Sequence, residues 1–206
     1  MPQNGYGDRV EQRMAQVVGE SPKIEALEPA EMSEAAKNLI GEVRAAAGAP
    51  ATGELPEYMR LLVKNPEFFK VNMETGTVLF RGRIPQRDRE LAVLRCGWLA
   101  GAPYEWGEHV RISKRCGVTD EEVERATIGS SAPGWSEHDA AVIRGVEELF
   151  SDFAVSDETF ATLARTWDEA QLIEFPGMVG AYITTALIQN TLRARLAPDN
   201  PGLTRR

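Results

Sequence analysis

The sequence predicts an all-α protein, and three observations support this fold class. Apolar residues recur at the three- and four-residue spacing of helices rather than at the spacing of strands. Residues that commonly cap helices precede several of these segments. No stretch combines two-residue alternation with hairpin turns, as β-strands would.

The N-terminal region is expected to be an extension of the main domain. Residues 1–20 are polar and contain glycine, so we expect them to be disordered or to lie over a neighbouring element. Ser33 is a candidate cap for a helix that runs to about Ala47 and closes at residues 48–50.

Two further helices and the clearest helix of the chain are expected next. Pro56 begins a helix that ends at Pro66, and the segment FFKVNMETGTVL continues as a helix with a weak end. The clearest helix lies in RIPQRDRELAVLRCGWLAG, with Pro85 at its start and Gly101 just past its end. Its apolar residues have helical spacing: Leu91, Val93, Leu94, Trp98 and Leu99.

The C-terminal half is also predicted to be helical. Its helices begin at capping residues: Thr119 with Glu122, Ser136 with Asp139 in the same arrangement, and Ser156. The last helix, residues 168–196, is long and unusually apolar, and Pro176-Gly177 should kink it.

Composition limits the classes of function. The chain has 206 residues, 43% hydrophobic and 26% charged, which is typical of one globular domain. A net charge of −8 argues against binding to nucleic acid. The N-terminus lacks the apolar region of a secretory signal, and no apolar run reaches the ~18 residues of a membrane span, so we expect a cytoplasmic protein. Cys96 and Cys116 have no zinc spacing and are expected to be buried or half-buried free thiols.

A glutamate and a histidine are candidates for chemistry in the segment GAPYEWGEHV. If Pro103 begins a helix over residues 103–116, Glu105 and His109 share a face one turn apart. A carboxylate beside an imidazole can hold its tautomer and raise its pKa, which would give a general acid–base pair. The same spacing also fits an exposed pair without function. The second histidine, His138, lies in the first turn of its helix and is expected to be exposed to solvent.

A second carboxylate, Glu90, is a candidate because of the tight Gly-Ala-Pro turn. Two helices joined by that turn would form a hairpin in which Glu90 and His109 lie about 16 and 12 Å from it along the axes, at 1.5 Å per residue. Their side chains could then converge. Neighbouring Arg87, Arg89 and Arg95 would equally allow Glu90 to be an ordinary ion-paired surface residue.

The segment RDRELAVLRCGWLAGAPYEWGEHVRISKRCGVTDEEV resembles the carboxymuconolactone decarboxylases and their relatives, the alkylhydroperoxidase D (AhpD) proteins. The resemblance continues more loosely through WSEHDAAVIRGVEELF and GAYITTALIQNTL. It implies an AhpD-like helical bundle over residues 51–200, with residues 1–50 as a partly disordered, partly helical extension.

The resemblance also indicates which branch of the family is involved. The glutamate, two cysteines and histidine of the peroxidase branch fall at Glu90, Ala102, Glu105 and His109, so both thiols are absent. Without a thiolate no disulfide can form, which argues against a thiol peroxidase. The decarboxylase-like branch carries the Tyr104, Glu105, Trp106 and His109 signature. It implies no cofactor, no metal and assembly as a homotrimer or homohexamer, which the long apolar final helix fits.

The resemblance implies a cofactor-independent lyase or decarboxylase that acts on a small cyclic acid, either lactone-type or derived from an aromatic compound. His109 would be the general acid or base, Glu105 would orient it or carry a second proton, and Glu90 would complete the relay. An apolar wall would come from Tyr104, Trp106 and Trp98. A substrate carboxylate would be held by one of Arg81, Arg83 and Arg87.

Three alternatives remain open from the sequence. The first is an isomerase or hydratase that moves a proton at the same site without releasing CO₂. The second is a divalent metal ion held by Glu90, Glu105 and His109. The third is a protein that keeps the fold but only binds a ligand or a partner.

Overall fold

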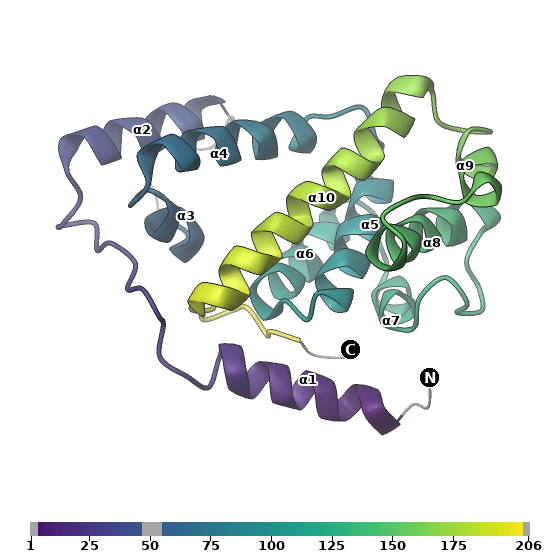
Figure 1. The fold of residues 1–206 in the computed structure, drawn as a ribbon, viewed down its shortest axis with the longest axis horizontal. Coiled ribbons are helices and arrows are strands. Elements are labelled where there is room, and N and C mark those ends of the chain that lie inside the picture. Colours follow the sequence, from purple (N-terminus) through teal and green to yellow (C-terminus); the bar gives the residue numbers. More distant parts are fainter. Residues whose placement is uncertain (1–3, 47–54, 204–206) are drawn as a thin grey trace.

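The computed structural model describes residues 4–46 and 55–203, and within these ranges it contains ten α-helices and no strand. The predicted all-α class is therefore confirmed. The helices, shown in Figure 1, are α1 (Asn4–Val17), α2 (Glu34–Ala46), α3 (Glu57–Leu62), α4 (Pro66–Phe80), α5 (Gln86–Leu99), α6 (Pro103–Arg115), α7 (Asp120–Ile128), α8 (Glu137–Ser151), α9 (Asp157–Leu163) and α10 (Glu169–Leu192).

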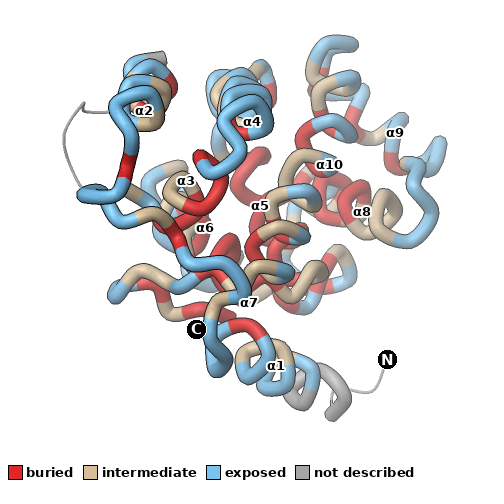
Figure 2. Tube along the Cα trace, turned by 60° about the vertical axis from the view of Figure 1, so that its left-hand side comes forward, coloured by how far each residue is buried: buried red, intermediate tan, exposed pale blue. Residues whose placement is uncertain are grey.

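Helix α5 is the centre of the fold. It packs against α6, α7, α8 and α10, and its residues from Asp88 to Trp98 are all buried. Figure 2 shows the buried segments gathered around α5 and α8, whereas α2 and α4 expose much of their length. Because α5 is buried on every side, it has no polar face that is exposed to solvent. Its charged residues, such as Glu90, are therefore buried as well.

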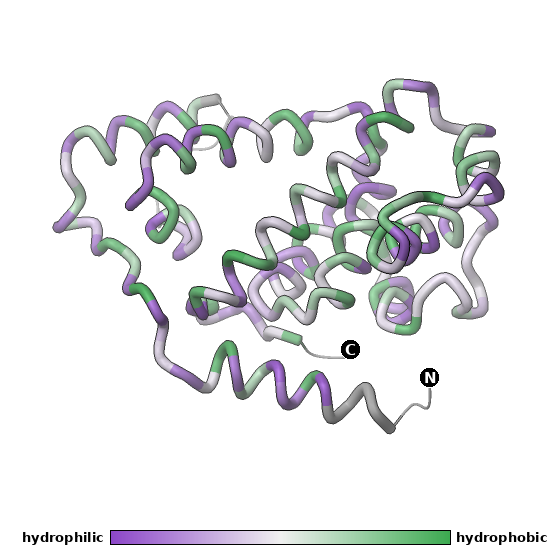
Figure 3. The backbone as a smooth tube through the Cα atoms, viewed as in Figure 1, coloured by the Kyte–Doolittle hydropathy of each residue, from purple (hydrophilic) through white to green (hydrophobic). Residues whose placement is uncertain are grey.

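The apolar core forms two clusters. The larger joins α5, α6, α7, α8 and α10, and the smaller joins α2 and α3 with Phe69 of α4 and Tyr104 of α6. Helix α10 runs diagonally across the molecule between them (Figure 1), and its middle is pale or green rather than purple in Figure 3. The two clusters thus meet at α6 and α10, where the candidate site lies.

The helix starts follow the predicted capping residues. The Thr119 and Glu122 capping box is present, with N–H to side-chain oxygen distances of 2.8 and 3.2 Å. Ser33 accepts a hydrogen bond from the N–H of Ala36 at 3.2 Å, and Ser156 caps α9. Ser136 caps α8 through the N–H of Asp139, although the Asp139 carboxylate turns to Arg87 instead of completing a box.

Of the two alternatives expected for the N-terminal residues, the structure bears out the second. Residues 4–17 form a helix whose Val10 and Met14 pack on the larger core cluster. One expectation about an element end needs correction. Helix α10 ends at Leu192 instead of continuing to residue 196, because Arg193 adopts a left-handed conformation with φ of 57°. The predicted closure of α2 at residues 48–50 lies outside the described residues.

Helix α10 is continuous across Pro176, so the kink there stays a prediction. Among the helices that the structure describes, none combines the length and low polarity needed to cross a bilayer.

Candidate functional site

The α5–α6 hairpin positions the candidate residues. Helix α5 ends at Leu99, and Gly101 then takes a φ of +56°, a conformation that glycine adopts without strain. Ala102 is extended, and Pro103 occupies the first turn of α6, where its missing N–H costs nothing. The predicted hairpin is therefore present, and α5 and α6 pack side by side.

Glu90, Glu105 and His109 converge as the hairpin predicts. Nδ1 of His109 lies 2.7 Å from Oε2 of Glu90, and Nε2 lies 3.2 Å from Oε1 of Glu105. Glu90 is completely buried, and the other two residues are buried with only small exposed fractions. The alternative readings, of an exposed Glu105–His109 pair and of a surface Glu90, are therefore wrong.

Arg89 neutralises Glu90 inside the protein. Its Nε and Nη2 atoms donate to Oε1 of Glu90 at 3.0 and 2.9 Å, and its Nη1 donates to the backbone oxygen of Phe80 at 2.7 Å. The guanidinium also lies 4.5 Å from the centre of the Phe80 ring. Both carboxylate oxygens of Glu90 thus have charged or polar partners, which a buried carboxylate requires.

These contacts shift the protonation equilibria of the site. Burial by itself would lower the pKa of His109, but the charge of Glu90 and the hydrogen bonds to Glu105 and Glu90 outweigh it and raise the pKa to about 10. Burial would likewise raise the pKa of Glu90, but His109 and Arg89 hold it below its usual value. At neutral pH the site therefore contains an imidazolium beside the Glu90 carboxylate.

Helix α10 contributes two residues that the sequence did not indicate. Nε2 of Gln189 donates to Oε2 of Glu105 at 2.8 Å, and the Gln189 side chain is buried. The Tyr182 ring meets the His109 ring edge-on, with centroids 5.2 Å apart. The adjacent amides Gln189 and Asn190, which follow an uncharged and largely apolar stretch of α10, are a signal that could have marked Gln189.

A cavity of about 360 Å³ opens beside this cluster, between α3 and α4 on one side and α6 and α10 on the other. Glu105 and His109 line it, whereas Glu90 lies behind them. The remaining lining residues are Pro56, Tyr58, Met59, Asn72, Met73, Thr75, Gly76, Leu79, Tyr104, Glu108, Ile112, Ala181, Tyr182, Thr185 and Gln189.

The predicted aromatic wall is only partly correct. Tyr104 lines the cavity, but Trp98 and Trp106 do not. Their rings pack on each other with centroids 4.9 Å apart inside the larger core cluster, and Trp106 is completely buried. Whether a helix face meets the core or the cavity depends on helices that are distant in the sequence, so short-range pattern could not separate wall from core.

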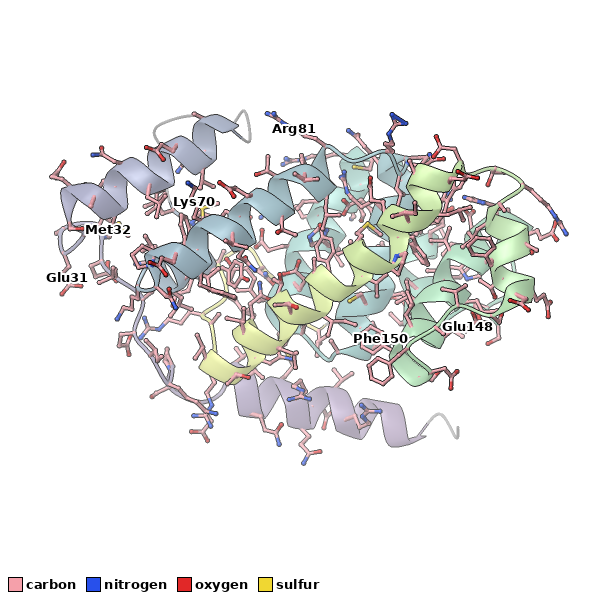
Figure 4. All side chains as sticks on the ribbon, turned by 45° about the horizontal axis from the view of Figure 1, so that its top comes forward. Glu31, Met32, Lys70, Arg81, Glu148 and Phe150 are labelled. Carbon is pink, nitrogen blue, oxygen red and sulfur yellow. The ribbon has the colours of Figure 1, made fainter. Side chains whose placement is uncertain are left out.

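The predicted arginines do not reach the cavity either. Arg87 bridges Glu122 and Asp139, with its Nη1 atom 2.7 Å from Oδ1 of Asp139. Arg83 is exposed beside Asp168, and Arg81 projects outward at the end of α4 (Figure 4). The expectation that one of these three holds a substrate carboxylate in this cavity is therefore wrong.

His138 is half-buried rather than exposed. Its Nε2 atom lies 2.8 Å from Oδ2 of Asp88, and its Nδ1 atom lies 2.9 Å from the hydroxyl of Thr166. The indole N–H of Trp167 donates to the same Asp88 oxygen at 3.0 Å. These contacts link α5, α8 and the segment before α10, away from the cavity.

The two cysteines are free, as expected, with Cys96 buried and Cys116 half-buried. Burial raises the pKa of both thiols, which disfavours the thiolate, and neither lines the cavity. The two positions at which the peroxidase branch carries its cysteines are occupied here by Ala102 and Glu105, and neither Cys96 nor Cys116 replaces them beside the cavity.

A metal centre is not formed by these side chains. In residues 4–46 and 55–203, no group of three or more His, Cys, Asp or Glu side chains is arranged to hold a metal ion. The two nitrogens of His109 point to different carboxylates on opposite edges of its ring, so Glu90, Glu105 and His109 do not meet at one point. This geometry contradicts the metal alternative.

Comparisons with known proteins agree with this fold. A protein of unknown function from Agrobacterium tumefaciens, related to AhpD, matches with a TM-score of 0.60 and 19% identity over 66% of this chain and 95% of that one. The debrominase Bmp8 in complex with 2,3,4-tribromopyrrole matches with a TM-score of 0.68 and 16% identity over 87% and 94%.

An AhpD-core, peroxidase-related protein from Ralstonia eutropha matches with a TM-score of 0.71 and 14% identity over 86% of this chain and 93% of that one. No curated protein matches the sequence. The family model of the carboxymuconolactone decarboxylase family matches residues 66–147, which run from α4 into α8 and include Glu90, Glu105 and His109. The resemblance found in the sequence is thus confirmed: residues 66–147 match the carboxymuconolactone decarboxylase family model, and the fold is similar to that of AhpD-like proteins.

Proposed function

We propose that this protein is a cofactor-independent general acid–base enzyme that acts on a small cyclic substrate in the cavity between α4, α6 and α10. The observation that carries the proposal is the position of His109, held between the carboxylates of Glu90 and Glu105 at 2.7 and 3.2 Å. Only Glu105 and His109 of this cluster line the cavity. Perturbed titratable groups beside a cavity are typical of catalytic sites.

The three residues have separate roles in the proposed mechanism. Glu90 holds the imidazole by its Nδ1–H and fixes the direction of the Nε2–H. The Glu105 carboxylate, which lines the cavity, accepts a proton from one carbon of the substrate. Because Glu105 then no longer pairs with Nε2 of His109, His109 can turn this N–H to an oxygen on which negative charge develops and donate the proton to it. When the product forms, His109 takes its proton back and Glu105 returns its own to another carbon of the ring.

The substrate is proposed to contain a small ring. Most of the cavity lining is apolar, and its volume of about 360 Å³ is within the range of small-molecule sites. Bmp8, which has a similar fold, was solved with 2,3,4-tribromopyrrole, a small ring. A ring that carries a carbonyl would allow removal of a proton from the adjacent carbon, with His109 stabilising the resulting enolate oxygen.

Two reactions fit these roles, and the charges of the cavity favour one of them. Loss of CO₂ from a lactone-type acid, the lyase reaction that the family description suggests, requires the cavity to hold a carboxylate. Glu105 and Glu108 line the cavity, and its one cation among the described lining residues is the His109 imidazolium, which is already paired with Glu90 and Glu105. No lysine or arginine is among these described lining residues. This distribution supports proton transfer on an uncharged ring, of the isomerase or hydratase type, over decarboxylation.

Self-association is a second proposal. Helix α10 exposes Ile173 and Leu187 by 76% and 62%, and between them it exposes Gly177, Gly180 and Thr184, which carry no charge. A second copy of the chain would cover this face, as in the predicted homotrimer or homohexamer.

The test of the enzymatic proposal combines solvent deuterium incorporation and CO₂ release over a panel of lactones, cyclic ketones and their carboxylic acids. We expect wild type to exchange protons of an uncharged ring, and His109→Ala to lose about 10²- to 10⁴-fold of this activity. His138→Asn is the matched control, because it removes the other histidine at a distance from the cavity. CO₂ release from the acids alone would establish the decarboxylating reaction instead. Equal activity of His109→Ala and wild type would contradict the proposal.

A further inference from the structure

We propose that the ligand of this cavity carries an O–H or N–H group on its ring and that Oε1 of Gln189 accepts a hydrogen bond from it, next to Glu105. The inference rests on the proposed function for the location of the site. It goes further by assigning Gln189 as a binding residue and by naming the ligand class as a hydrogen-bond donor.

The orientation of the Gln189 amide is fixed by Glu105. Nε2 donates to Oε2 of Glu105 at 2.8 Å, so the other end of the amide must be the carbonyl oxygen. That oxygen, Oε1, is buried and has no hydrogen-bond partner among the residues that the structure describes, and Gln189 is one of the residues that line the cavity. Buried polar atoms normally have partners, so an unsatisfied acceptor on a lining residue points to a donor supplied by the ligand.

Three hydroxyls around the cavity have already used their protons. The hydroxyl of Tyr58 donates to Oδ1 of Asn72 at 3.1 Å, and the hydroxyls of Thr75 and Thr185 donate to the backbone oxygens of Val71 and Ala181. These oxygens retain only their capacity to accept. Together with Oε1 of Gln189, they belong to lining residues that can accept a hydrogen bond from a ligand.

The charged groups have the same bias. Glu105 and Glu108 are acceptors, and both N–H groups of the His109 imidazolium are directed at Glu90 and Glu105. A ligand that carries an ionised carboxylate could offer these acceptors no hydrogen-bond donor from that group, so its carboxylate would not complement Glu105 and Gln189. A phenol-like or pyrrole-like ring places a donor at these two residues and leaves its apolar part against Met59, Met73 and Leu79.

The test compares ring pairs that differ only in the donor: phenol with anisole, and pyrrole with N-methylpyrrole, with benzoate as the acidic probe. Dissociation constants are measured at millimolar ligand concentrations by ligand-observed NMR, which does not depend on turnover. We expect wild type to bind each donor about tenfold more tightly than its methylated analogue, and benzoate more weakly than phenol.

Gln189→Met has a similar volume but lacks the acceptor and the Nε2 bond to Glu105. In this variant, each donor and its methylated analogue should have about equal dissociation constants. Gln171→Met is the matched control, since it makes the same change on α10 outside the cavity and should keep the preference. Equal binding within the pairs, tighter binding of benzoate, no binding of any ring, or a preference that survives in Gln189→Met would each overturn the inference.

The two proposals can fail separately. If the donor preference holds and depends on Gln189 while no proton exchange is found on any substrate, the enzymatic proposal fails and the ligand class stands. If exchange occurs and depends on His109 but the pairs bind equally, the ligand class fails and the enzyme stands.

Discussion

Nδ1 of His109 lies 2.7 Å from Oε2 of Glu90, a residue that precedes it by 19 positions on the neighbouring helix of the hairpin. Glu90 is completely buried and its other oxygen is bonded to Arg89, so it cannot swing away to meet a substrate. It acts on the cavity only through the imidazole.

Replacing Glu90 should change the protonation of His109. Glu90→Gln removes the negative charge beside Nδ1, so the pKa of His109 should fall from about 10 toward its ordinary value of 6.5. NMR titration of the two histidine rings measures this directly. Asp88→Asn is the matched control, because it should lower the pKa of His138 and leave that of His109 in place. An unchanged His109 pKa in Glu90→Gln would refute the assigned role.

Stability should fall as the pH rises from about 6.5 to 10. The folded-state pKa of His109 is raised to about 10 from 6.5, so its contribution is fully present below pH 6.5 and is lost through the folded pKa. Urea unfolding between pH 6 and 10 should show this decline in wild type. The difference in the free energy of unfolding between wild type and His109→Asn should become smaller as the pH increases. A constant difference across this range would show that the imidazolium does not stabilise the fold.

Replacing Trp106 should change the stability of the protein without changing its affinity for the ligand. It is completely buried against Trp98, so Trp106→Ala should destabilise the protein by about 3–5 kcal/mol, and Trp106→Phe by less. Trp106→Phe should retain the ligand dissociation constant, because the indole does not line the cavity. Thermal unfolding and ligand titration of the same samples test both statements. Weaker ligand binding by Trp106→Phe with an unchanged melting temperature would instead support the prediction that Trp106 contacts the substrate.

Arg87 should be structural rather than substrate-binding. It joins α5 to Glu122 of α7 and Asp139 of α8, and Arg87→Met would leave two partly buried carboxylates without their partner. We expect a loss of about 1–3 kcal/mol in the free energy of unfolding. Arg83→Met is the control, since Arg83 is exposed and its removal should cost less than about 0.5 kcal/mol. A larger effect of Arg87→Met on substrate affinity than on unfolding would contradict this assignment.

The exposed face of α10 should mediate self-association. Light scattering of wild type should give a multiple of the 22.7 kDa chain mass, and Leu187→Glu should shift the mass toward the monomer by placing a charge in the contact. Ile128→Glu changes a residue of similar exposure, 57%, on α7 and should leave the mass unchanged. A monomeric wild type would rule out the proposed assembly.

Features that depend on neighbouring residues could be predicted from the sequence alone. Proline and glycine limit the backbone at Pro85, Gly101 and Pro103, and capping side chains such as Thr119 bond within their own turn. These local constraints were enough to predict the helices from α2 to α10, the α5–α6 hairpin and the convergence of Glu90 with His109. The resemblance to the carboxymuconolactone decarboxylase family could also be recognised from the sequence around Glu90, Glu105 and His109.

Features that depend on distant helices could not be predicted from the sequence. Gln189 reaches Glu105 across 84 positions, and Trp106 is core rather than cavity wall because it packs on Trp98 of α5 within the larger core cluster. Arg87 is neutralised by residues from two other helices, and His138 is drawn inward by Asp88. Helical periodicity states which residues share a face, but the packing of the other helices determines whether that face meets the core, the cavity or the solvent.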